Sequence, residues 1–153
     1  MTTTSQPVSP PAISLTSAGV VVLSPGPDAT DIIDAGQNAS LRLEVKITGF
    51  NSVVGMYTGE QVKITHYATE AETNTVSKFG PFTFTTPPTV AALNAGFDFT
   101  TGPFTTGVFG SGKDFTTASG DDDGVYRVVT VLHFVSDPSN SVINDRILAV
   151  VNP

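Results

Sequence analysis

One segment alternates apolar and polar side chains residue by residue, and this pattern constrains the fold more than any other feature. Between residues 39 and 48 the apolar positions are Leu41, Leu43, Val45 and Ile47, and the polar ones are Arg42, Glu44, Lys46 and Thr48. Successive side chains of a β-strand point to opposite faces of the sheet. The segment is therefore expected to be a strand with one face in the core and the other in water.

Further segments show strand patterns of the same kind. We expect strands at 13–23, 61–69, 78–86, 125–135 and 145–151, separated by Gly- and Pro-rich turns. Ala18-Gly19 predicts a bulge, and Gly80-Pro81 is expected to break the strand at 78–86. The only helical turn expected is Thr89 to Ala95, closed by Gly96.

Strand parity also predicts which side chains form the core. In the strand at 61–69, His66 shares the inward parity of Val62 and Ile64, opposite Lys63 and Tyr67. The expected core residues are Leu41, Leu43, Val45, Ile47, Val62, Ile64, Tyr126, Val128, Leu132 and Phe134.

A short motif before the strand at 125–135 narrows the fold. Asp122-Asp123-Gly124-Val125-Tyr126 reads D-x-G-x-Y, which resembles the tyrosine corner of immunoglobulin-like domains. In that register Val128 stands where antibody domains have their second core cysteine, and this chain has no Cys and no Trp. The resemblance implies a disulfide-free, all-β, immunoglobulin-like or fibronectin-type antiparallel β-sandwich of about seven strands over residues 12–153.

The first eleven residues are rich in Thr, Ser, Gln and Pro and show no periodicity. Such a segment does not bury enough apolar surface to fold alone. Residues 1–11 are therefore expected to form an extended N-terminal arm that orders by docking on another chain.

Charge and hydropathy exclude several classes of partner. The chain has 7 Lys and Arg against 14 Asp and Glu, a net charge of −7, and the basic residues are scattered. Nucleic-acid binding needs clustered basic residues, so nucleic acid is not expected as a partner. No apolar run is long enough to span a membrane, and no signal peptide is seen in this numbering. We expect a soluble protein whose compartment stays open, with extracellular or particle-associated locations among the options.

Candidate chemistry is sparse. Asp121, Asp122 and Asp123 offer carboxylate oxygens of the kind that bind calcium, although their spacing is not that of an EF-hand, and the alternative is a solvated turn that also carries the D-x-G-x-Y motif. The two histidines, His66 and His133, lie on different expected strands, and no metalloprotease or nucleophile-elbow motif occurs. We expect no enzymatic activity and no cofactor other than this calcium site.

Aromatic residues gather in one part of the chain. Eight of the ten phenylalanines lie between Phe79 and Phe115, among Gly, Thr and Pro. Two interpretations stay open: the rings fill the core beneath long loops, or some of them contact a partner.

The outward parity of the strand at 125–135 is too apolar for a face left to water. We expect an interface made of Val129, Val131, His133 and Val135, extended by Tyr67. A loop of the same chain is the alternative cover. The predicted function is a structural or assembly subunit acting as a homo-oligomer or with other protein subunits. The alternative is a carbohydrate- or cell-surface-binding module that uses loops at one end of the sandwich.

Overall fold

The structure, a computed structural model, describes residues 14–23, 29–34, 38–71, 74, 76–105, 124–138 and 140–151. Two predictions lie outside these residues, namely the arm at 1–11 and the acidic triplet Asp121, Asp122 and Asp123.

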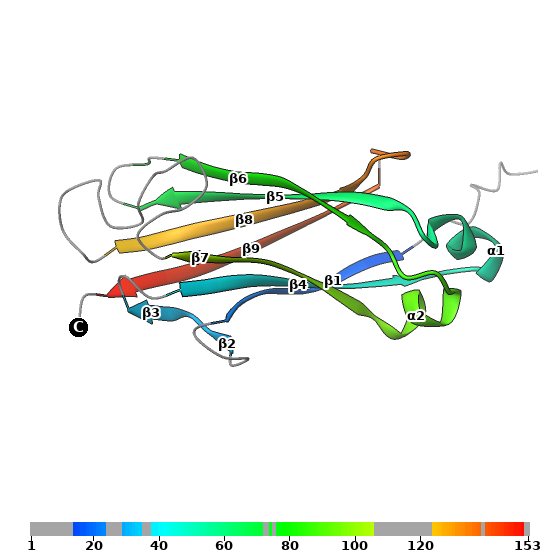
Figure 1. The fold of residues 1–153 in the computed structure, drawn as a ribbon, viewed down its shortest axis with the longest axis horizontal. Coiled ribbons are helices and arrows are strands. Elements are labelled where there is room, and N and C mark those ends of the chain that lie inside the picture. Colours follow the sequence, from blue (N-terminus) through cyan, green and yellow to red (C-terminus); the bar gives the residue numbers. More distant parts are fainter. Residues whose placement is uncertain are drawn as a thin grey trace, which may run out of the picture.

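The prediction of an all-β fold is confirmed (Figure 1). Seven long strands and two short ones make up most of the described chain, and the helical segments are brief. The strands are β1 (Ser14–Leu23), β2 (Ala29–Thr30), β3 (Ile32–Asp34), β4 (Asn38–Thr48), β5 (Gln61–Glu70), β6 (Val76–Thr85), β7 (Phe97–Thr105), β8 (Gly124–Phe134) and β9 (Ser141–Val151). The helical segments are α1 (Asn51–Val54), the 3-10 turn η1 (Gly55–Tyr57) and α2 (Val90–Ala95).

The strands form two sheets. Sheet A has the order β2-β1-β4-β7, and sheet B has the order β3-β9-β8-β5-β6. All pairs are antiparallel except β3 with β9, which run parallel from Ile32 opposite Ala149. Figure 1 shows β5, β6 and β8 on one side of the molecule and β1, β4 and β7 on the other.

The core lies between these layers, and all ten predicted core residues are buried. Even-numbered residues of β5, β8 and β9 point toward sheet A, as the alternation predicts. Sheet A contributes Leu41, Leu43, Val45 and Ile47 to the same hydrophobic cluster.

The phenylalanines from Phe79 to Phe99 belong to this core. Phe79 and Phe99 are buried, and Phe82, Phe84 and Phe97 pack against the cluster. Phe84 of β6 stacks on Phe99 of β7 with ring centroids 4.8 Å apart, so aromatic rings fill the space between these two edge strands. The core interpretation is confirmed for these five rings.

Several predictions about elements were wrong. Strand β6 continues through Gly80-Pro81 because it is an edge strand, where proline does not remove a ladder hydrogen bond, although the register shifts at this dipeptide, between the pairs His66–Phe79 and Ile64–Phe82. The segment from Phe97 to Thr105 is a strand, and α1 with η1 adds helical turns beyond Thr89 to Ala95.

Other local predictions were right. The register of β1 shifts between Ser17 and Gly19, where the bulge was expected. The helix α2 begins after Thr89, whose hydroxyl accepts a hydrogen bond from the Ala92 N–H, and it ends at Gly96 with φ of 100°.

Candidate interaction face

The most distinctive surface of the described chain is the face of sheet B that points away from the core. We call it the outer face: the odd-numbered residues of β5, β8 and β9, continued past the end of β8 by Val135, with Ile32 of β3 and Val76 and Lys78 of β6. Antiparallel sheets usually cover one face with the core and leave the other to water, so polar residues would be expected here.

Instead, exposed apolar side chains gather on this face. Among the described residues, eight large hydrophobic side chains are strongly exposed, and six of them belong to the outer face. They expose between 42% and 67% of their surface: Ile32, Val76, Val125, Val135, Ile143 and Ile147. Exposed apolar side chains gathered on one face are typical of an interaction surface.

The structure places all five predicted interface residues on this one face. Tyr67 lies directly opposite Val129 across the β5–β8 ladder, and His133 lies opposite Lys63. Tyr67, Val129, Val131 and His133 are half-buried because they sit on the two central strands, between neighbouring side chains. Val135, beyond the end of β8, is 42% exposed.

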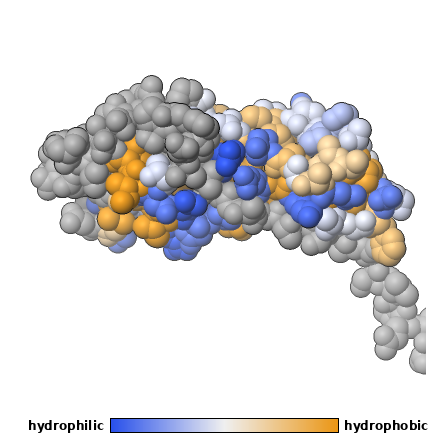
Figure 2. All heavy atoms as spheres, turned by 90° about the horizontal axis from the view of Figure 1, so that it is seen from below, coloured by the Kyte–Doolittle hydropathy of each residue, from blue (hydrophilic) through white to orange (hydrophobic). Residues whose placement is uncertain are grey.

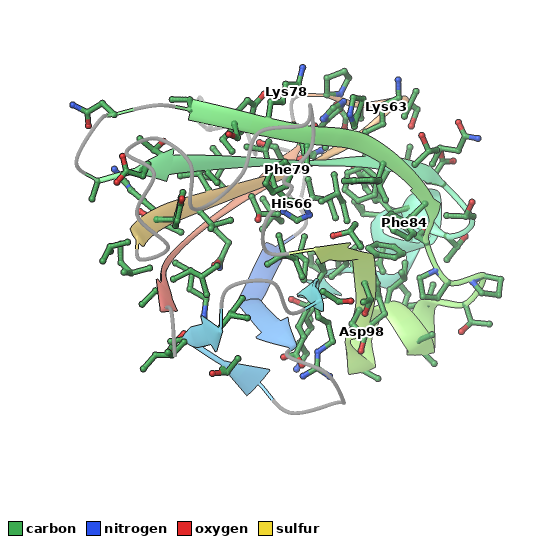
Figure 3. The ribbon with its side chains drawn as sticks, turned by 60° about the vertical axis from the view of Figure 1, so that its left-hand side comes forward. Lys63, His66, Lys78, Phe79, Phe84 and Asp98 are labelled. Carbon is green, nitrogen blue, oxygen red and sulfur yellow. The ribbon has the colours of Figure 1, made fainter. Side chains whose placement is uncertain are left out.

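The charges of the outer face differ in sign from those of the whole chain. Its described side chains include Lys63, Lys78 and Arg127 against Asp145, a net charge of +2, whereas the full chain carries −7. Figure 3 shows Lys63 and Lys78 pointing outward from sheet B, on the opposite side from His66. The charged residues divide the face into two halves.

One half is apolar and locally neutral. On β8 and β9, Arg127 donates to one carboxylate oxygen of Asp145 from Nε at 2.9 Å and from Nη2 at 2.5 Å. This contact lowers the pKa of Asp145 and raises that of Arg127, each mainly through the hydrogen bond. The other half, on β5 and β6, carries Lys63 and Lys78.

On β4 and β7 of sheet A, the described side chains that point outward are polar. There Arg42 pairs with Glu44 at 3.2 Å, and Asp98 lies opposite Glu44 on the next strand. Figure 2, which views the molecule from below, shows hydrophilic and hydrophobic residues interspersed among the coloured atoms. The apolar character of the outer face of sheet B is therefore not shared by the outward side chains of β4 and β7.

His66 is the most perturbed titratable group described, and it lies inside the molecule. Its side chain is fully buried, with Nδ1 2.7 Å from the Thr130 hydroxyl and Nε2 2.8 Å from the Thr101 hydroxyl. Thr101 uses its single proton on the Leu41 carbonyl oxygen, so it accepts from Nε2–H, and Nδ1 accepts from Thr130. The bond to Thr101 of β7 crosses from sheet B to sheet A, whereas the bond to Thr130 of β8 lies within sheet B.

The burial of His66 lowers its pKa from 6.5 to about 4, through desolvation of the charged form. With both ring nitrogens bonded to threonine hydroxyls and no solvent access, this imidazole is a structural group that joins the sheets. It is not placed to act on a ligand.

A second polar cluster joins the helical end of the molecule to the β8–β9 turn. The Tyr57 hydroxyl donates to Asp137 Oδ2 at 3.0 Å, and the Asn140 amide donates to both groups, at 2.8 Å and 2.6 Å. The Tyr57 ring packs edge-on against Phe134. Burial, followed by the bond to Asp137, raises the pKa of Tyr57.

The calcium prediction rested on residues outside the described chain. Within the described ranges, no group of three or more His, Asp or Glu side chains is close enough together to hold a metal ion. None of the described helices is long and apolar enough to cross a membrane.

Comparisons with known proteins add no relative. Neither the models of known protein families nor the curated proteins gave a match to this chain.

Sequence reasoning found the centre of the outer face and missed part of its periphery. Ile143 was overlooked because the predicted last strand began at residue 145, while β9 begins at Ser141. Ile32 was missed because β3 is three residues long and joins β9 from far away in the sequence. Extending the alternation of β9 backward through Ile143 would have found the first of these residues.

Proposed function

We propose that this chain is a non-enzymatic structural or assembly subunit, and that the outer face of sheet B is the surface through which it contacts other protein subunits. The observation that carries the proposal is that, of the eight strongly exposed large hydrophobic residues in the described part of the chain, six gather on this one face.

The state of the sheet edges supports association by a face. Edge strands invite the addition of another strand, and proteins discourage this with prolines, bulges and lysines. The edge strand β6 contains Lys78, Gly80-Pro81 and a register shift, and β7 pairs with β4 through another shift, between Ala39 and Leu41. These irregular edges favour a partner that packs on the face of sheet B.

We also propose that the fold is immunoglobulin-like. In the notation of that family, β1-β4-β7 corresponds to A-B-E, and β9-β8-β5-β6 corresponds to G-F-C-C′. Tyr126 is buried two residues before Val128, as the resemblance implies. Domains of this type commonly act by binding, although the fold alone does not assign a function.

The alternative function, a carbohydrate- or cell-surface-binding module, depends on loops at one end of the molecule. It stays a prediction, because the long connection at 106–123 lies outside the described residues.

Replacing Ile143 with Lys tests the proposed face. Ile143 is 67% exposed, so the substitution leaves the core intact while placing a charge in the apolar half. We expect self-association to be lost at an unchanged melting temperature, measured by size-exclusion chromatography with light scattering over a range of concentrations.

The matched control is Thr100→Lys, at an exposed position on the outer surface of sheet A. It should associate like the parent. A parent chain that stays strictly monomeric, or an Ile143→Lys variant that associates normally, would count against the proposed function.

A further inference from the structure

The apolar half of the outer face contains a four-residue arrangement that is complementary to itself. Arg127 lies opposite Ile147 across the β8–β9 ladder, and Val129 lies opposite Asp145. These four residues are the corners of a square on the outer face. The charged residues Arg127 and Asp145 occupy one diagonal, and the apolar residues Val129 and Ile147 occupy the other. Arg127 and Asp145 are also in direct contact along their diagonal, at 2.9 Å and 2.5 Å.

We propose that a second copy of this chain packs on this half of the outer face about a two-fold axis, with Arg127 of each copy facing Asp145 of the other. This inference rests on the proposed function and names the partner. In a two-fold interface the same patch is used by both subunits, so every contact occurs twice in reciprocal form. A patch that carries one positive and one negative group side by side meets that requirement.

The geometry also locates the axis. When two sheets pack face to face, their two-fold axis lies in the plane between them. An axis that crosses between Arg127 and Asp145 runs close to the other diagonal, so Val129 packs against its own copy and Ile147 does the same. Charged and apolar contacts are then satisfied together.

The charges favour a second copy of this chain over a partner that makes no contact with Arg127 and Asp145. Both charges are well exposed, at 62% for the Arg127 side chain and 45% for Asp145, so each has room for a further contact. The neutral apolar half lets two chains of net charge −7 meet without bringing like charges together at the centre. Lys63 and Lys78 lie on the other half, where the polar rim of an interface is expected.

Charge reversal with mixing tests this arrangement. The Arg127→Asp variant has carboxylates at both positions, so in a dimer of this variant each carboxylate faces a carboxylate of the other copy. The Asp145→Arg variant has guanidinium groups at both positions, which face each other in the same way. Each variant alone should self-associate at least about tenfold more weakly than the parent, because like charges then face each other twice. An equimolar mixture should recover association to within a few-fold of the parent, since each acidic pair meets a basic pair.

The measurement is sedimentation velocity on each variant and on the mixture, with circular dichroism to confirm that both fold. The control is Lys46→Asp, which reverses a charge on the outer surface of sheet A and should associate like the parent. Because the chain has no cysteine, Ile147→Cys adds a second reading. A bismaleimide that spans about one sheet-to-sheet spacing, ~10 Å, should cross-link it far more than the off-axis Ile143→Cys.

The outcomes separate the possible occupants. If the parent associates and Ile143→Lys abolishes this, but the mixture of reversed variants stays dissociated, the two-fold arrangement is wrong while the proposed function stands. If the outer face instead packs head-to-tail on another, acidic surface of the next copy, the Arg127→Asp variant should associate more weakly than the parent and the Asp145→Arg variant more strongly. A monomeric parent, as expected if a segment of the same chain or a different protein covers the face, overturns the inference together with the self-association on which it rests.

Discussion

At the scale of single residues, His66 shows what alternation predicts and what it does not. The parity of β5 places His66 beside Val62 and Ile64 on the inward face, and the structure confirms this. Its two partners come from residues 35 and 64 positions away in the sequence. Nothing local to β5 indicates them, because they become neighbours only when β7 and β8 pack around it.

The burial of His66 predicts a dependence of stability on pH, because desolvation lowers the pKa of the imidazole in the folded state. The pKa of His66 is about 4 in the folded state and 6.5 for an unperturbed histidine, as in the unfolded chain. Between these two pH values the unfolded chain therefore binds more protons than the folded one. The contribution of His66 to the unfolding free energy is fully present above about pH 6.5 and is lost as the pH falls toward and below 4. The total loss from this group is about 3 kcal/mol.

Urea denaturation of the parent and of His66→Gln across this pH range measures the contribution. The difference in unfolding free energy between the two proteins should shrink as the pH falls from 6.5 to about 4. A constant difference between the parent and His66→Gln would show that His66 does not titrate with folding.

At the scale of elements, strands with strict alternation were predictable and those interrupted by turn-forming residues were not. In β7, Phe97, Phe99 and Thr101 point inward in alternation with Asp98 and Thr100. The strand was missed because Gly102-Pro103 and the surrounding threonines are typical of loops. Its inward aromatic residues pack on β6, a contact that the local sequence does not encode.

Strand β8 allows a matched test of the two faces of sheet B. Leu132→Ala opens a cavity at a side chain only 1% exposed, and we expect a loss of about 2 to 5 kcal/mol in unfolding free energy. Val129→Ala, on the half-buried outward parity of the same strand, should cost less than about 1.5 kcal/mol under conditions where the protein is monomeric.

Both values come from chemical denaturation at low protein concentration. Equal losses for Leu132→Ala and Val129→Ala would contradict the assignment of inner and outer faces.

At the scale of the whole molecule, the sequence predicts an acidic all-β chain with one strand too apolar on its outward side. The width of the apolar face could not be predicted, because it depends on which strands are neighbours. Ile32 joins the face only through the parallel pairing of β3 with β9. The full surface is therefore a product of topology, while its centre at Val129 and Val131 is readable from β8 alone.

The central claim is that the outer face of sheet B is covered by another protein chain. Hydroxyl-radical footprinting of the parent over a range of concentrations tests this directly, because it reports the solvent exposure of individual side chains. Phe50 and Met56 provide an internal control, since they are 66% and 70% exposed and lie on the helical end of the molecule. We predict that labelling of Ile143 and Ile147 falls as the concentration rises while labelling of Phe50 and Met56 stays constant. Constant labelling of the outer face, or protection confined to Phe50 and Met56, would contradict the account.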